Sequence, residues 1–173
     1  MASSPVQNFM RQQGFAEEPA EACDVHFQGL YFQPRIVFPL VLTAILLQLA
    51  STAGSAALHL LISAVLWWNA LLPSWNPFER AYNRWLAAPR GQRPLVPAPG
   101  PRRFAQGMAA ALNLAAALAL WTGALPLAWV MQAFLVVGFS ALLFGRFCLG
   151  AYLYHLLRGR VGFANSTLPW ARG

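Results

Sequence analysis

The chain has 173 residues, of which 58% are hydrophobic and only 10% are charged. A soluble domain of this length could not bury so much apolar surface, so the composition predicts a protein surrounded by lipid. The formal net charge of +7 does not indicate a nucleic-acid partner, because every basic residue is an arginine and the arginines lie in short blocks beside apolar runs.

Residues 1–34 are predicted to form a polar N-terminal tail that carries four of the five acidic residues, Glu17, Glu18, Glu21 and Asp24. The tail lacks the order of a cleavable signal peptide, in which a basic segment precedes an apolar one. A polar segment of this kind is a candidate for docking a partner protein.

An uncharged apolar run over residues 36–53 is close to the shortest length that spans a bilayer. Pro39 is expected in the first turn of this helix, where its missing N–H has no partner to lose. The small residues of STAGSA predict a tight turn before a second uncharged run. Residues 35–72 are therefore predicted to form a first transmembrane hairpin, whose end at the lipid headgroups is marked by Trp67, Trp68 and Trp75.

Residues 73–103 are predicted to form a basic, proline-rich cytoplasmic loop. Asn76, Pro77 and Glu79 have the order of an N-cap, a first-turn proline and a capping-box acid, so a short helix is expected there. An amphipathic helix on the membrane surface and a connector packed on the bundle both explain its apolar face. That face consists of Phe78, Tyr82, Trp85 and Leu86.

Residues 104–160 are predicted to form a second transmembrane hairpin with a helical extension, followed by a C-terminal tail over residues 161–173. In the first helix of this second hairpin, a small residue recurs at every fourth position, which favours close helix packing in lipid. Asn113 is expected to make a hydrogen bond between helices. The small residues are Gly107, Ala111, Ala115 and Ala119.

The last apolar run, residues 127–157, is too long for one span and is interrupted by Arg146. We expect the helix to leave the lipid near Gly145 and Arg146, because an arginine at the interface reaches water easily and a buried one needs a partner. The fold class is thus an all-α integral membrane protein with four transmembrane helices in two hairpins and an interfacial helix. Arginines flank the spans at both termini and the central loop but are absent from the tight turns, so both termini are predicted to be cytoplasmic.

Cys148 and His155 lie seven positions apart and would share a helix face. Two helical turns separate them by about 10.5 Å, which is long for a direct pair or for two ligands of one metal ion. Cys23 and His26 could supply two further ligands, but no zinc signature surrounds them, so no metal site is predicted.

His59 lies one turn into the second apolar run. It could ligate a haem or a chlorophyll-type pigment, or it could hydrogen-bond to a neighbouring helix. The second interpretation is favoured because His59 is expected close to the non-cytoplasmic interface, with no partner histidine within another membrane span. The sequence also has no paired carboxylates and no phosphate-binding loop, so no enzyme class is indicated and no cofactor is predicted.

Three segments, NPFERAYNRWLAAPRG, VPAPGPRRFAQGM and FCLGAYLYHLLRG, together resemble an uncharacterised bacterial membrane family, domain of unknown function four-three-nine-five. The resemblance runs from about Gln33 to Gly159 and implies a four-helix inner-membrane domain with no established reaction. It also implies a Cys-x-x-Cys pair, in which a second thiol resolves the mixed disulfide formed by the first. Here Cys148 holds the first position and Ala151 the second, so only distant Cys23 could resolve.

The sequence therefore favours a non-catalytic accessory or stabilising subunit of a larger bacterial membrane complex, respiratory or photosynthetic. Its expected partners are other membrane subunits and lipid. One alternative is a thiol-redox or sulfur-handling protein that uses Cys148 with Cys23. The other is a pigment-binding or haem-binding protein that uses His59.

Overall fold

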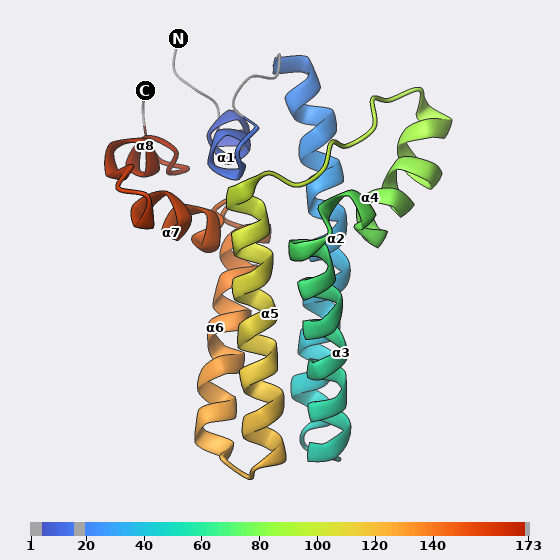
Figure 1. Ribbon diagram of the computed structural model, residues 1–173, viewed down its shortest axis with the longest axis vertical. Helices are drawn as coiled ribbons and strands as arrows, with labels where there is room; N and C mark the ends of the chain where they lie inside the picture. The colour runs from blue at the N-terminus through green and yellow to red at the C-terminus, as the bar shows by residue number, and fades with distance from the viewer. Residues whose placement is uncertain (1–4, 16–19, 172–173) are drawn as a thin grey trace.

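A computed structural model of the protein describes residues 5–15 and 20–171, and these ranges contain helices and no strands. Four of the helices are long and apolar enough to cross a membrane, over Phe27–Leu47, Thr52–Leu71, Gly100–Trp121 and Leu125–Leu143. They run side by side in an elongated bundle, which we call the stem (Figure 1). The expected all-α fold with four such helices is confirmed.

The stem consists of α2 (Ala20–Leu47), α3 (Thr52–Leu71), α5 (Gly100–Trp121) and α6 (Leu125–Leu143). The short turns over residues 48–51 and 122–124 both lie at the end far from the chain termini (Figure 1). Ser51 caps α3, because its hydroxyl accepts a hydrogen bond of 3.0 Å from the N–H of Gly54. The buried core between the helices is Val37, Val41, Ile62, Leu66, Ala110, Leu135 and Phe139.

The first long helix differs from the prediction of residues 36–53. It begins at Ala20 and ends at Leu47, so Pro39 lies inside it and not in its first turn. The early start follows from Phe27, Leu30 and Tyr31, which share one helical face and are buried in the core of the opposite end. The early end follows from the cap at residue 51, which starts the next helix.

The remaining helices are short and gather at one end of the stem, opposite the two turns (Figure 1). We call this end the head. It contains α1 (Pro5–Gln13), η1 (Pro73–Trp75), α4 (Pro77–Tyr82), the π-helical turn η2 (Asn83–Ala87), η3 (Ala88–Arg90), α7 (Leu149–Leu157) and α8 (Val161–Ser166). Phe9 and Met10 of α1 are buried against Phe27, Leu30 and Tyr31 of α2. Part of the segment expected to be a polar tail is therefore a packed helix.

The predicted short helix after Asn76 is present as α4. The Asn76 Oδ1 accepts hydrogen bonds from the backbone N–H groups of Phe78 and Glu79, as its place before a proline indicates. Tyr82 is buried and its ring lies 5.8 Å from that of Phe32 on α2. Trp85, expected on the same face, is instead 70% exposed, because the π-helical turn from residue 83 changes the angular register.

The last apolar run is divided and not continuous. The helix α6 ends at Leu143, and α7 begins at Leu149 and turns away from the stem (Figure 1). At the break Arg146 takes a left-handed backbone conformation with φ 52°, is exposed, and places its guanidinium 5.7 Å from the ring centre of Phe27. The arginine thus lies in the head, where the sequence placed the exit of the chain.

The predicted stripe of small residues on α5 faces more than one environment. Gly107 faces α3, since a Cβ there would lie 3.5 Å from the Trp67 ring, and Ala119 is buried. Ala111 is exposed and Ala115 is half-buried. An α-helix has 3.6 residues per turn, so a spacing of four drifts by about 40° at each step and cannot keep one face. The small residues buried on α5 also include Ala110, Ala116 and Ala117.

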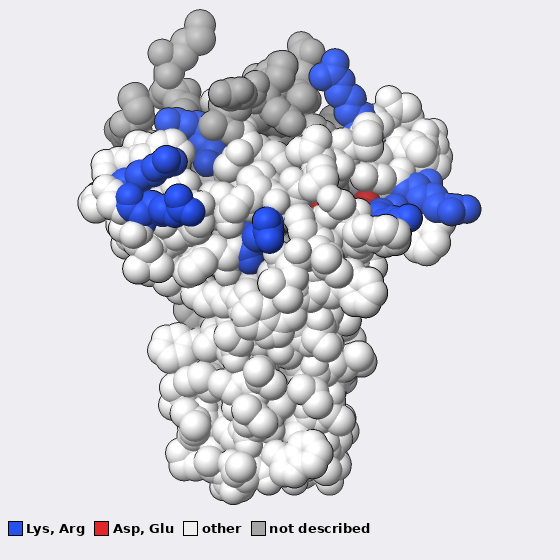
Figure 2. Space-filling view, viewed as in Figure 1, with Lys and Arg blue, Asp and Glu red and all other residues white. Residues whose placement is uncertain are grey.

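Among the residues that the structure describes, the charged side chains lie in the head or on the parts of α2 and α5 next to it. Figure 2 shows arginines around the wide end of the protein and none on the visible face of the stem. Among the residues whose side chains are described, Glu79 is the acidic one and it is buried. Four apolar helices beneath a basic head suggest a multi-pass membrane protein.

Candidate functional site

Polar side chains from four segments form a buried chain of contacts in the half of the stem far from the head. His59 of α3 is fully buried, and its Nδ1 lies 2.8 Å from the Oδ1 of Asn113 on α5. Its Nε2 lies 3.2 Å from the Nε2 of Gln132 on α6. Gln132 also donates to the Oε1 of Gln48 at 2.8 Å. Side-chain contacts thus join α3, α5, α6 and the turn that follows α2.

The donors and acceptors of this network are consistent with a neutral His59. The Asn113 Nδ2 donates to the backbone oxygen of Ala109 at 2.8 Å, which leaves its Oδ1 to accept from the N–H at Nδ1 of His59. The Nε2 of His59 then accepts from Gln132. Because both ring nitrogens have partners, His59 in this state does not offer a nitrogen to a pigment metal. The expected hydrogen bond of Asn113 between helices is present.

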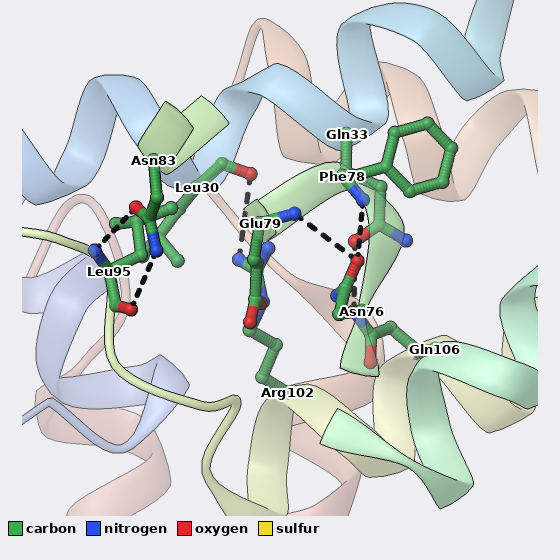
Figure 3. Close-up of polar contacts among 9 residues, drawn as sticks. All are labelled: Leu30, Gln33, Asn76, Phe78, Glu79, Asn83, Leu95, Arg102 and Gln106. Atoms are coloured by element: carbon green, nitrogen blue, oxygen red, sulfur yellow. Dashed lines mark hydrogen bonds and ion pairs between the residues drawn. The ribbon is translucent and has the colours of Figure 1, made fainter. Parts of the chain in front are cut away.

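A second cluster lies where the stem meets the head (Figure 3). Arg102 in the first turns of α5 and Glu79 of α4 are both buried, and the Arg102 Nε lies 3.4 Å from the Glu79 Oε1. The two elements meet because Asn83 fixes the returning loop to α4, donating to the Leu95 oxygen and accepting from the Leu95 N–H. The result is an ion pair shielded from water.

Arg102 uses only part of its hydrogen-bonding capacity. A guanidinium has five N–H donors, and here Nη1 reaches the Leu30 oxygen at a long 3.5 Å. The Nη2 atom has no hydrogen-bond partner among the described residues. One turn further along α5, Gln106 donates to the Gln33 Oε1 at 2.9 Å, while its own Oε1 is buried without a partner in the same described part.

Burial raises the pKa of the Glu79 carboxyl, and the positive charge of Arg102 opposes that rise. The folded protein therefore holds the Glu79 proton to a higher pH than the unfolded chain does. Stability from this group is fully present below its ordinary pKa of 4.5 and is lost as the pH rises through the raised, folded-state pKa. We expect Glu79→Gln to remove this decline, measured by unfolding in mixed micelles over a pH series; an unchanged pH profile would contradict the assignment.

Cys148 lies at the boundary between the break and α7, as the N-cap of that helix. Its backbone N–H donates to the Oε1 of Gln12 on α1 at 2.9 Å, and its side chain packs in the core formed by Phe9 and Met10. Ala151, where the resemblance implies the second cysteine of a pair, is fully buried in the same core. The helix α1 therefore covers the cysteine.

Burial raises the pKa of the Cys148 thiol, although a hydrogen bond at Ala151 and the charge of Arg102 act in the opposite direction. The thiolate is the reactive form, so a raised pKa and a covering helix both slow attack. In a Cys23→Ser background we expect iodoacetamide at neutral pH to modify Cys148 at least about tenfold more slowly in the folded protein than after unfolding in SDS. Equal rates before and after unfolding would contradict this placement.

His155 does not meet Cys148 in a common site. Its Nε2 donates to the backbone oxygen of Gln12 at 3.0 Å, and its ring packs edge-on against Phe163 at 4.7 Å between centres. The side chains of Cys23 and His26 lie outside the described residues. Within the described part, no group of three or more histidine, cysteine or acidic side chains could hold a metal ion.

The tryptophans at the end of α3 lie where the stem meets the head. The Trp68 Nε1 donates to the Trp75 oxygen at 3.1 Å, and the guanidinium of Arg80 lies 4.9 Å from the ring centre of Trp75. Trp67 packs beside Gly107 and is partly exposed. These positions fit indole rings at the level of lipid headgroups.

Sequence reasoning expected hydrogen bonds between helices for His59 and Asn113 but missed their glutamine partners and the whole second cluster, for different reasons. Arg102 belongs to a block of loop arginines, and nothing in the sequence marks it as the buried one. Gln48 and Gln132 are isolated amides far apart in the chain, and their contact depends on how the helices pack. One usable signal was that Glu79 is the acid outside the N-terminal segment, close to the loop arginines.

The chain was compared with protein-family models, curated proteins and solved structures. Neither the curated proteins nor the solved structures gave a match. The model of domain of unknown function DUF4395 matches residues 29–159. The match begins within α2 and contains α3, α5 and α6, together with Arg102, Glu79, His59 and Cys148. On this evidence the chain belongs to the DUF4395 family.

Proposed function

We propose that the protein is a non-catalytic subunit that stabilises a larger complex in the bacterial inner membrane. The observation that carries the proposal is the exposure of α6. Only 17% of the most apolar stretch of α6 is buried within the protein. The corresponding share is 39% to 44% in the other three spans. A helix so little covered by its own chain leaves one side of the stem open to a neighbouring membrane subunit.

The chemistry of the buried groups supports a structural role. His59 is held on both ring nitrogens by Asn113 and Gln132. Cys148 is buried beneath α1 and has Ala151 where a resolving thiol would stand. These arrangements favour a subunit over the thiol-exchange and pigment-binding alternatives, because each candidate group is already engaged in packing or hydrogen bonds.

We further propose that the head faces the cytoplasm, with both termini on that side. Exposed arginines surround the head, while the turns at the other end of the stem carry no charge. An excess of arginine in cytoplasmic connections sets the orientation of membrane proteins. The exposed arginines on the short helices and connections of the head are Arg80, Arg84, Arg90, Arg93, Arg146, Arg158 and Arg160.

Site-specific photocrosslinking tests the subunit proposal. A benzoylphenylalanine at Val137 on α6 is expected to form an adduct with another membrane polypeptide in living cells. Leu61 on α3 is a matched control, since the two side chains are 61% and 62% exposed. We expect the control to give mainly lipid adducts. Lipid adducts alone at both positions, together with a monomer in native extracts, would overturn the proposal.

A further inference from the structure

The strongest unassigned feature is a cavity of about 350 Å³ where the stem meets the head. Its walls come from α1, α2, α3, α5, α6 and α7 and are almost entirely apolar. Phe134 of α6 lines the cavity and is 56% exposed, so the cavity reaches the surface of the stem. A molecule with an alkyl chain could therefore enter the cavity from the surrounding lipid.

One end of the cavity is polar. Arg102, Gln106, Gln33, Gln13 and Cys148 all line it. Arg102 and Gln106 are only 6% and 7% exposed, and each has a polar atom without a hydrogen-bond partner in the described part of the chain. Buried polar groups are nearly always hydrogen-bonded, so a guanidinium with free donors beside an apolar cavity indicates an acceptor that is supplied by a ligand.

Charge favours an anionic group over a neutral one. Arg102 faces Glu79 at 3.4 Å without hydrogen-bond geometry, so the carboxyl accepts none of the N–H donors of the guanidinium. The positively charged guanidinium therefore keeps free N–H donors at the wall of the cavity. Carboxylate and phosphate oxygens match this planar group and form charge-assisted hydrogen bonds with it.

We propose that the cavity binds a single-chain anionic amphiphile, with its oxyanion head on Arg102 and its alkyl chain between α5 and α6. Along α5 the lining extends from Arg102 to Leu112, which at 1.5 Å per residue is about 15 Å. That length accommodates a medium-length alkyl chain. Gln106, one turn below Arg102, already donates to Gln33 and offers only its Oε1, an acceptor, so the oxyanion is assigned to Arg102 alone.

The direct test uses a photoreactive fatty acid with a diazirine in its chain, added to the purified full-length protein in non-ionic detergent. Mass spectrometry should locate the adducts on α5 and α6 residues of the cavity. Laurate and dodecyl phosphate are then added as competitors, and their relative strength separates a fatty-acid source from a phospholipid-type source. Dodecanol and dodecylamine have the same chain with a neutral and a cationic head.

Two variants separate charge from space. Arg102→Gln is expected to lower labelling about tenfold, the loss that one to two charged hydrogen bonds imply. Arg103→Gln is its control, because Arg103 is the neighbouring residue and does not line the cavity. Gly138→Leu should fold and block labelling, since a Cβ at this lining residue meets no atom within 4 Å. Ala133→Leu, on the exposed side of α6, should have no effect.

The expected result is labelling in the cavity that laurate or dodecyl phosphate removes and dodecanol does not. Equal competition by dodecanol would overturn the proposal, because it would mean that any alkyl chain fills the space without recognition by Arg102. Unchanged labelling in Gly138→Leu, or adducts located outside the cavity, would overturn it as well. If Arg102→Gln does not fold, the competitor series and Gly138→Leu still decide the outcome.

Discussion

Glu79→Ala is expected to lower the free energy of unfolding by about 3–5 kcal/mol, the range measured when one partner of a buried ion pair is removed. The reason is that Arg102 stays buried and loses the charge that faces it at 3.4 Å. Unfolding of the purified protein in mixed micelles measures the effect. The substitution would also remove the contact between α4 and α5, so proteolysis of the loop over residues 83–99 should become faster.

Arg84→Ala provides the control for this experiment. Arg84 lies in the turn that follows α4 and is exposed, and exposed substitutions normally change stability by no more than about 0.5 kcal/mol. The double variant Glu79→Ala with Arg102→Met should recover much of the lost stability, since it removes both buried charges. If Glu79→Ala were as mild as Arg84→Ala, the pair would not be a buried interaction.

His59→Leu is expected to lower the free energy of unfolding by about 1–3 kcal/mol, because it leaves buried polar groups on Asn113 and Gln132 without partners. The side chain is fully buried between α3, α5 and α6, so water cannot replace the lost hydrogen bonds. The same unfolding assay measures the loss. The absorption spectrum of the purified protein should not change.

Asn69→Leu is a matched control on the same helix. Asn69 is also fully buried, but both of its side-chain polar atoms lack a hydrogen-bond partner among the described residues. Replacing an unpartnered buried amide by a hydrocarbon of similar size should leave stability unchanged or increase it. Equal losses in His59→Leu and Asn69→Leu would show that the polar network contributes nothing specific.

The sequence predicted the features that depend on local chemistry. Long uncharged runs identified the four helices, and the order of Asn76, Pro77 and Glu79 identified the start of α4. The need for a break near Arg146 followed from the length of the last apolar run. Each of these features is set by neighbouring residues in the chain and by the thickness of a bilayer.

What the sequence did not predict depends on packing between distant segments. The helix α1 lies in the segment predicted to be a polar tail, because its few apolar residues are Val6, Phe9 and Met10 and they pack only against other segments of the head core. Gln132 and Gln48 meet across 84 positions of sequence. Arg102 differs from the exposed Arg103 only in which side of α5 it occupies. Such differences arise from the angular position of each residue on its helix.

We propose above that the stem crosses the membrane four times and that the basic head is cytoplasmic. This topology is tested by labelling with a membrane-impermeant maleimide in intact bacterial spheroplasts, in a background of Cys23→Ser and Cys148→Ala. Leu49→Cys, in the exposed turn between α2 and α3, should be labelled directly. Arg93→Cys, in the head, should be labelled only after the membrane is permeabilised. Direct labelling of Arg93→Cys, or protection of Leu49→Cys, would contradict the account.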